Sequence, residues 1–324
     1  MTTSSEHKLA IVLPAYKPEF LRDALASISN QTDRDFTVYV GDDHSPSDLR
    51  AMIDSFSGHL DIRYHRFEEN RGRRSLVEQW NRCIRLSEEP WVWLFSDDDV
   101  MDAGCVAAWR ATLSNHPLHD VYRFQTRTID GTGNVTRWNP QHPEYESSLS
   151  FVYQRMSRAR LSFGCEYIFS RAAFDREGGM VDFPLAWCSD DASWAAFGAK
   201  TGIRTVPGPR VDWRYSGRNL SFAGPSTRAA KRAALFQYLE WLNARMGDFT
   251  GGASDPDVQS IKALMPAWLM HQLKVADCLA DRKTLKRLNE VIGQPRSETL
   301  RDFIRLARHN MQVTGQRLRN RVTH

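Results

Sequence analysis

Residues 91–100 have the sequence WVWLFSDDDV, in which an apolar run ends in three consecutive aspartates. The run 91–95 shows no alternation of polar and apolar side chains, which is typical of a strand buried on both faces of a sheet. Asp97, Asp98 and Asp99 follow almost at once, so they are expected at the carboxyl end of that strand. In open parallel sheets this edge is where ligands bind.

Three similar runs precede this stretch and alternate with helical patterns. The predicted strands cover residues 9–13, 36–40 and 62–67, and the predicted helices cover residues 20–28, 45–57 and 74–86. Strands that alternate with helices predict a Rossmann-like α/β fold, a mainly parallel central sheet flanked by helices. Asp42 and Asp43 follow the strand at 36–40, and we therefore expect them at the same edge as the aspartate triplet.

The pattern changes in the second half of the chain. Residues 121–129, 163–170 and 210–215 are predicted to be longer strands in antiparallel or mixed pairing. From about residue 226 the pattern is helical, with predicted helices at 226–245, 256–279 and 297–320 and a linker rich in Gly, Asp and Ser at 247–256. We therefore expect a catalytic α/β region over residues 1–222 and an α-helical C-terminal extension over residues 223–324.

The aspartate triplet is the first candidate for a functional site. Adjacent ionised carboxylates repel one another and raise each other's pKa unless a cation compensates them. Mg²⁺ or Mn²⁺ prefers oxygen ligands and would bridge the diphosphate of a nucleotide. The alternative is a solvated turn, or a set of caps for the helix that follows.

Other polar clusters have two interpretations each. Asp42 and Asp43 either cap the following helix or accept a hydrogen bond from a nucleotide base. Arg71, Arg73 and Arg74 surround Gly72 and would hold an anionic diphosphate or a base, unless they form a solvated loop. In Ser189-Asp190-Asp191, a carboxylate either caps a helix or serves as a general base.

The order of these motifs is more specific than any one of them. The segments VLPAYKPEFLRDALASISNQT, DFTVYVGDDHSPSD, ENRG, WVWLFSDDDV and CSDDASW follow one another along the chain. This order resembles the inverting glycosyltransferases of family 2, which have the GT-A fold and include bacterial polysaccharide and glycan enzymes. The resemblance covers about residues 8–221, and its first half matches best.

The resemblance implies a metal-dependent transferase of the hexosyltransferase type, which moves a sugar from a nucleotide diphosphate donor, UDP above all, to a hydroxyl of a glycan or lipid-linked saccharide. It places Asp43 on the donor's base, the backbone of Pro14, Ala15 and Tyr16 beside it, Asp98 near the ribose and Asp99 on the Mn²⁺ or Mg²⁺ ion. The remaining expected residues are, for the donor, Asp97, Arg71, Arg74, Arg214 and Arg218, and, for the general base, Asp191 or Asp190.

The chain departs from the family pattern after the last strand. Ser216 stands where many members have a histidine that approaches the metal, so the third metal ligand is left open. Two alternative functions remain open, a nucleotidyltransferase on a related fold and a non-catalytic sugar-nucleotide-binding protein. The chain lacks the motifs of P-loop enzymes, nicotinamide enzymes, zinc proteases and serine hydrolases.

Charge is unevenly distributed. Residues 281–324 contain eleven Lys or Arg and four Asp or Glu, a local net charge of +7 within a chain of net charge +4. The tail combines arginines with apolar residues in a predicted helix, which favours peripheral contact with an anionic membrane surface, or packing on the rest of the protein. Nucleic acid is not expected as a partner, because no recognition motif accompanies the basic stretch. No leader or membrane span is evident and the five cysteines are scattered, so we expect a cytoplasmic protein, with peripheral contact at the inner face of the membrane.

Overall fold

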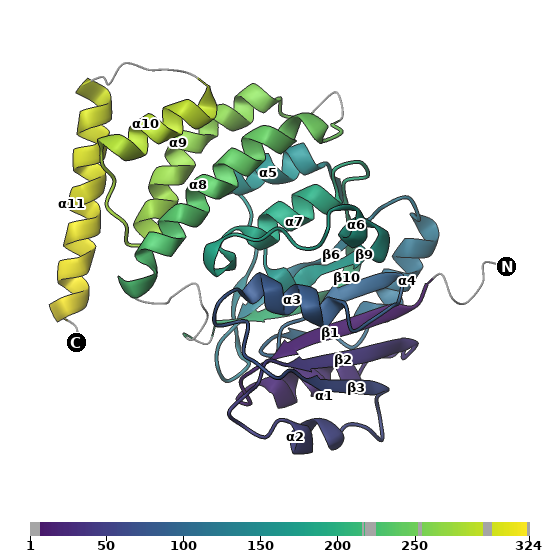
Figure 1. The fold of residues 1–324 in the computed structure, drawn as a ribbon. Helices are drawn as coiled ribbons and strands as arrows, with labels where there is room; N and C mark the ends of the chain where they lie inside the picture. The colour runs from purple at the N-terminus through teal and green to yellow at the C-terminus, as the bar shows by residue number, and fades with distance from the viewer. Residues whose placement is uncertain (1–6, 216, 218–224, 252–254, 294–299, 323–324) are drawn as a thin grey trace.

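The computed structural model describes residues 7–215, 217, 225–251, 255–293 and 300–322 (Figure 1). A mixed sheet forms its centre, with strands in the order β3-β2-β1-β4-β9-β6-β10-β5, while β7 pairs with β6 and β8 with β10. The strands are β1 (Leu9–Ala15), β2 (Phe36–Asp42), β3 (Ile62–Arg66), β4 (Trp91–Leu94), β5 (Val100–Met101), β6 (Val121–Ile129), β7 (Val135–Trp138), β8 (Tyr145–Glu146), β9 (Tyr167–Ser170) and β10 (Ile203–Arg214).

The first four strands of this order, β3, β2, β1 and β4, are parallel, as the sequence predicts. β9 runs antiparallel to both β4 and β6, and β10 is parallel to β6. The sheet is therefore mainly parallel, as predicted, and its antiparallel pairings fall in the half where the pattern of the sequence changes. The carboxyl ends of β1, β2 and β4 lie together because Ala15 pairs with Asp42 and Val12 with Leu94.

Helices cover both faces of the sheet and create two cores. One core contains apolar side chains of α1, α2 and α4, and the other contains those of α3 and of α5 to α10, with Leu306 from α11. The helices are α1 (Leu21–Ser29), α2 (Arg50–Asp54), α3 (Leu76–Ile84), α4 (Cys105–Asn115), α5 (Ser148–Met156), α6 (Arg171–Arg176), α7 (Ser189–Phe197), α8 (Arg228–Arg245), α9 (Val258–Val275), α10 (Arg282–Ile292) and α11 (Leu300–Val322).

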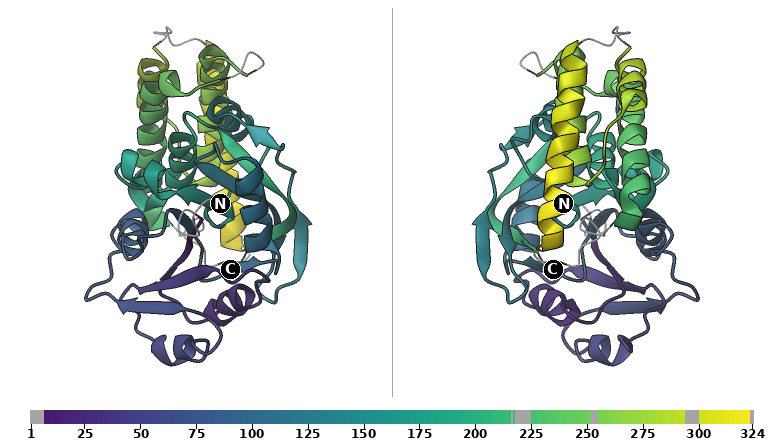
Figure 2. Two further views of the ribbon diagram at one scale, coloured as in Figure 1. Left: turned by 90° about the vertical axis from the view of Figure 1, so that its right-hand side faces the viewer. Right: turned by 90° about the vertical axis from the view of Figure 1, so that its left-hand side faces the viewer.

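The side views show α8 to α11 as a layer beside the sheet (Figure 2). α8 contacts the short 3₁₀ helix at Pro184–Ala186 and α7, and α11 contacts α9. In the part of the chain that the structure describes, no helix is both long and apolar enough to cross a bilayer.

Several predicted boundaries were wrong for local reasons. The helix predicted over 45–57 is reduced to α2, because the Asp42 carboxylate and the Ser45 hydroxyl hold residues 45–47 in a turn. The strand predicted over 163–170 is shortened to β9, which starts at Tyr167, because Gly164–Glu166 form a 3₁₀ turn. β10 begins at Ile203, seven residues before the strand predicted there.

Candidate active site

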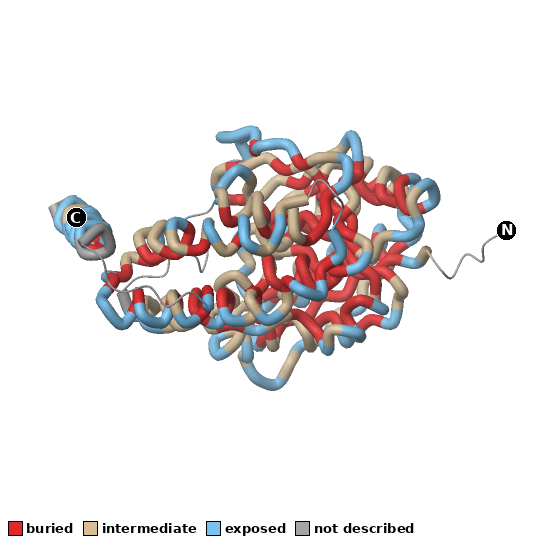
Figure 3. The backbone as a smooth tube through the Cα atoms, turned by 90° about the horizontal axis from the view of Figure 1, so that it is seen from above, coloured by how far each residue is buried: buried red, intermediate tan, exposed pale blue. Residues whose placement is uncertain are grey.

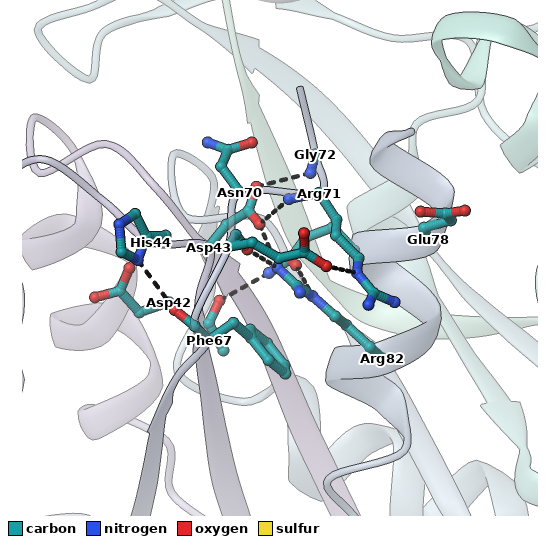
Figure 4. A network of polar contacts seen from close by, with 12 residues as sticks. Asp42, Asp43, His44, Phe67, Asn70, Arg71, Gly72, Glu78 and Arg82 are labelled. Atoms are coloured by element: carbon teal, nitrogen blue, oxygen red, sulfur yellow. Dashed lines mark hydrogen bonds and ion pairs between the residues drawn. The ribbon is translucent and has the colours of Figure 1, made fainter. Parts of the chain in front are cut away.

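The two aspartates at the end of β2 have different environments (Figure 4). Asp42 is fully buried and accepts hydrogen bonds from the Tyr64 hydroxyl at 2.6 Å, Arg66 Nη1 at 2.9 Å and the Ser45 amide at 2.7 Å. All these donors belong to the protein, so Asp42 has a structural role. It fixes the turn that presents the next residue, Asp43.

Asp43 holds the loop that contains the predicted arginines. Its carboxylate accepts the backbone N–H groups of Arg71 at 2.8 Å and Gly72 at 2.9 Å, together with a hydrogen bond from the Arg82 guanidinium. A Cβ atom on residue 72 would lie 2.5 Å from Asp43 Oδ2, so this loop requires glycine there. The backbone of this loop, rather than its arginine side chains, therefore surrounds Asp43.

The arginines differ from the expectation. The Arg71 side chain pairs with Glu69, and the Arg74 side chain pairs with Glu78, both on the surface. Arg82 on α3, which the sequence analysis did not single out, packs over the Phe67 ring at 3.7 Å and reaches Asp43. No sequence signal indicates this contact, because Arg82 lies 39 residues from Asp43 in the chain.

The aspartate triplet follows β4 closely and lies against the turn at the end of β1, residues 15–17 (the β1 turn). Asp97 Oδ2 accepts the backbone N–H groups of Tyr16 at 3.0 Å and Lys17 at 3.4 Å. The Ser45 hydroxyl donates to the Tyr16 carbonyl, and the Asp43 amide donates to the Ala15 carbonyl. The structure therefore brings the β1 turn, Asp43 and the triplet to one edge of the sheet, as predicted.

Arg214 lies beneath this turn. Its backbone N–H donates to Asp99 Oδ1 at 2.8 Å, and its Nε donates to the Asp98 carbonyl at 2.7 Å. The rest of the guanidinium donates to the carbonyls of residues 130 and 131 and to Asp23, and it stacks on the Phe20 ring. Arg214 is 1% exposed, and its described hydrogen bonds go to the protein, so its guanidinium does not face an open donor site.

The three carboxylates have raised pKa values. Burial, with a further contribution from neighbouring carboxylates, raises the pKa of Asp97 to about 7 and that of Asp98 to about 7. Burial also raises the pKa of Asp99, to about 6, against hydrogen bonds from Cys165, Arg214 and Ser96. Ionising all three at neutral pH is therefore unfavourable without a nearby cation.

The three carboxylates of the triplet differ in burial and in the hydrogen bonds that they accept from the protein. Asp97 is held by two backbone amides, and Asp99 is buried and held by Arg214. Asp98 is only partly buried, and no other residue within the described part of the chain donates a hydrogen bond to its carboxylate. Over the same described residues, no group of three or more metal-binding side chains converges. This arrangement fits an ion that takes one or two carboxylates and its other ligands from a diphosphate and water.

The second acidic pair begins α7. Arg155 Nε contacts both oxygens of Asp191, at 2.9 and 3.0 Å, and Asp191 is buried. Asp190 is partly exposed and accepts the Asp191 amide at 2.9 Å. Burial, then the neighbouring Asp191 charge, raises the pKa of Asp190 to about 7, whereas Arg155 acts in the opposite direction. Arg155 was not identified from the sequence.

The backbone before this pair is strained. Leu185, Ala186 and Cys188 have φ values of 62°, 54° and 68°, in the left-handed region that residues with a Cβ rarely adopt. Such strain persists when surrounding structure fixes it, and it is frequent at functional sites. Here Phe183 packs on Tyr238 of α8, and Lys231 of α8 lies over the Trp187 ring. The helical region therefore supports the segment that leads to Asp190.

Two of the predicted positions, Arg218 and Ser216, lie outside the described residues. Between the two acidic sites, the Cys165 thiol donates to Asp99, and the Tyr167 ring stacks on Trp194 of α7 at 4.5 Å. Residues 165–167, at the junction of the 3₁₀ turn and β9, therefore link the triplet to the helix that presents Asp190.

Comparison with known proteins identifies the family of the chain. Residues 10–177, more than half of the chain, match the family model described as Glycosyl transferase family 2. The chain belongs to glycosyl transferase family 2. It is therefore a glycosyltransferase, and this membership favours a transferase over the nucleotidyltransferase and the non-catalytic binder. None of the curated proteins compared with this family 2 member matches its sequence significantly.

Solved structures support the GT-A fold. The structure of S. aureus TarS 1-349 matches with a TM-score of 0.61 at 15% identity, over 88% of this chain and 81% of that one. The same TarS fragment in complex with UDP-GlcNAc matches with a TM-score of 0.60 at 16% identity, over 95% and 92%. The mannosyltransferase PcManGT from Pyrobaculum calidifontis, in complex with GDP-Man and Mn²⁺, matches with a TM-score of 0.52 at 15% identity, over 96% and 86%.

Proposed function

We propose that this family 2 member is a metal-dependent, inverting glycosyltransferase that transfers a sugar from a UDP-linked donor to a hydroxyl of a saccharide acceptor. The observation that best supports the metal is the Asp98 carboxylate, which is open between two aspartates that the protein holds in place. UDP is proposed because the Asp43 site resembles the family's uracil site, and because a TarS structure of the same fold contains UDP-GlcNAc.

The donor site is proposed to lie along the β1 turn. Asp43 keeps a fixed orientation through the two loop amides, and a carboxylate so fixed can still accept the N–H of a base through a remaining lone pair. The Tyr16 side chain is 40% exposed beside it. Arg214 is proposed to position the Asp98-Asp99 turn rather than to contact the diphosphate, because its described hydrogen bonds are directed to the protein.

We propose Mn²⁺ or Mg²⁺ as the metal, which Asp98 would hold together with the donor's diphosphate. The family resemblance places the ion on Asp99, which is buried and already accepts the Arg214 amide. When bound, such an ion neutralises the charge that develops on the leaving diphosphate. The contribution of the chain itself is to fix the turn: Tyr16 and Lys17 amides orient Asp97, and the Arg214 amide orients Asp99.

The general base is proposed to be Asp190, whereas the family resemblance places it on Asp191. Both oxygens of Asp191 are occupied by Arg155 Nε, and the side chain is buried, so Asp191 is the less accessible carboxylate for an acceptor hydroxyl. Asp190 is the less buried of the pair, and its pKa near 7 suits a base at neutral pH. In the reaction, the acceptor oxygen bonds to the anomeric carbon as the carbon–oxygen bond to the diphosphate breaks. The hydroxyl proton passes to Asp190, and the nucleotide leaves with the bonding electron pair.

Calorimetric titration of the full chain with UDP, GDP and dTDP tests the donor and the metal together. We expect UDP to bind best, and only with Mn²⁺ or Mg²⁺ present. Asp98→Asn should weaken UDP binding at least about tenfold, while Asp54→Asn, on the surface of α2, should not change it. UDP binding of equal strength in excess chelator would contradict the metal, and preference for GDP or dTDP would contradict the proposed donor.

A further inference from the structure

A basic groove lies in the helical region, separate from the residues discussed above. It has a volume of about 560 Å³, and α9 and α11 form most of its lining. Its cations are Arg158, Lys274, Arg305 and Arg308. Two histidines line it too. One of them, His271, contacts Arg158 at 3.0 Å, and burial, followed by the Arg158 and Lys274 charges, lowers its pKa. Its lining includes no carboxylate among the described residues.

Among the described residues, three cations of this groove lack the carboxylate partner that many arginines elsewhere in the molecule have. Arg155, Arg214 and Arg317, for example, each pair with an aspartate. Lys274, Arg305 and Arg308 have no such partner, if the comparison is limited to the part of the chain that the structure describes. Unpaired positive charges held along one groove indicate an anionic counterpart.

Apolar side chains accompany these charges. α11 packs on the protein through Leu306, His309 and Val313, which are 7%, 6% and 1% exposed. The outer surface of the same helix has Ile304, Met311 and Leu318, which are 46%, 66% and 58% exposed. Their spacing of seven residues places the three side chains in one row along the helix. Viewed from above, α11 is largely exposed and lies at the outer edge of the molecule (Figure 3).

We propose that this surface, the row Ile304-Met311-Leu318 with the groove cations beside it, docks on an anionic lipid bilayer. A bilayer matches both features, since its headgroups carry negative charge and its acyl region accepts apolar side chains. A free phosphate would leave the apolar row unexplained. A second copy of this surface would bring the arginines of two helices together, and like charges at an interface oppose association.

The tail helix has two candidate roles, packing on the protein and contact with a membrane, and each of its two faces suits one of them. Leu306 and Val313 pack inward, and Arg317 pairs with Asp277 at 2.8 Å. Arg305, Arg308 and the apolar row face outward. The side chains of Arg301, Phe303 and Arg321 are not described. Docking does not depend on the proposed donor or base, because none of these residues belongs to the active site.

Co-sedimentation with vesicles tests the proposal on the full chain. We expect binding to vesicles of equal parts phosphatidylglycerol and phosphatidylcholine, little binding to pure phosphatidylcholine, and release by high salt. The double variant Arg305→Glu with Arg308→Glu should bind at least about 25-fold more weakly, at about fivefold for each cation lost. Ile304→Ser with Met311→Ser should also bind more weakly, by roughly tenfold or more, because the apolar row no longer inserts.

A matched control is Lys283→Glu with Lys286→Glu on α10, which makes the same change in net charge on another surface and should bind like the wild type. Thermal unfolding of each variant shows whether it is folded, and UDP titration should be unchanged in all of them. Equal binding by the Arg305/Arg308 variant and the control would overturn the proposal. Full displacement by soluble glycerol phosphate, or a dimer that dissociates in the Ile304/Met311 variant, would overturn it in favour of a free phosphate or a second copy.

Discussion

Asp190 and Asp191 are neighbours in the chain but meet opposite conditions in the folded protein. Arg155 compensates Asp191, whereas burial and the Asp191 charge disfavour the ionised form of Asp190. An amide at position 191 leaves the partly buried Arg155 without its partner carboxylate, which costs several kcal/mol. An amide at position 190 removes a carboxylate that is costly to ionise.

These environments predict opposite effects for two single substitutions. Asp190→Asn should lower turnover by roughly 10²-fold or more, keep UDP affinity and stabilise the protein by about 1–3 kcal/mol at pH 8. Asp191→Asn should destabilise it by about 3 kcal/mol. Steady-state kinetics and thermal unfolding measure both. Nearly full turnover in Asp190→Asn, with an inactive but stable Asp191→Asn, would exchange the two roles.

The raised pKa of Asp190 also predicts how stability and activity change with pH. A carboxyl whose folded pKa is about 7 binds a proton that the unfolded chain releases near pH 4, so its contribution to stability falls as pH rises between these values. Turnover at saturating metal and donor should rise through about pH 7 as Asp190 ionises.

Arg155→Gln provides the control for this pH profile. Loss of the Arg155 cation should move the acidic limb to higher pH, because that cation lowers the pKa of Asp190. An unchanged limb in this variant, with the fold intact, would show that another group titrates.

Individual candidate residues were predictable from sequence where they follow a buried strand or, as for Asp190 and Asp191, where an acidic pair begins a helix. Asp43 and Asp97 to Asp99 were found because the end of a buried strand marks the ligand edge of the sheet. Arg82 and Arg155 were not found, because each reaches its aspartate from a helix more than thirty residues away along the chain.

At the scale of elements, β10 connects the second half of the sheet to the aspartate triplet. It pairs with β6 and β5, and its last residue, Arg214, holds the Asp98-Asp99 turn from below. A lysine cannot reproduce the fork that reaches Asp98, Asp23 and the backbone carbonyls at once.

Arg214→Lys should therefore lower stability by about 2 kcal/mol and raise the KM for the donor, while Asp190 continues to act as base. Arg210→Lys, on the same strand over the exposed Trp138 ring, is the control and should change neither quantity. Thermal unfolding and donor titration decide. A lower turnover at unchanged KM would indicate that Arg214 contacts the transition state instead.

Helices and strands were predictable where the spacing of apolar residues follows a single period. β6 has the predicted bounds, and β1, β2 and β4 differ from them by at most a few residues. α10 was missed because residues 280–296 were predicted as a gap between the helices at 256–279 and 297–320, although Asp281 caps its start and Gly293, with φ of 71°, ends it. β5, β7 and β8 are short strands whose pairing depends on distant partners.

For the whole molecule, the predicted division at residue 222 falls outside the described residues, and the sheet before it and the helical layer after it share a core. Leu235 and Leu239 of α8 belong to the same apolar cluster as Val92 of β4 and Trp194 of α7. The helical layer therefore supports the strained segment before Asp190 and, on its outer side, presents the basic groove. The sequence predicted that layer but not its contact with the catalytic helix.

Real-time proton NMR of a UDP-sugar in which the sugar is α-linked, with water as the acceptor, reports the metal dependence and the stereochemistry of transfer together. We expect that Mn²⁺ allows slow cleavage, that the β-anomer of the free sugar appears first, and that chelator or Asp190→Asn stops the reaction. First appearance of the α-anomer, or cleavage at the same rate in excess chelator, would contradict a metal-dependent inverting transferase.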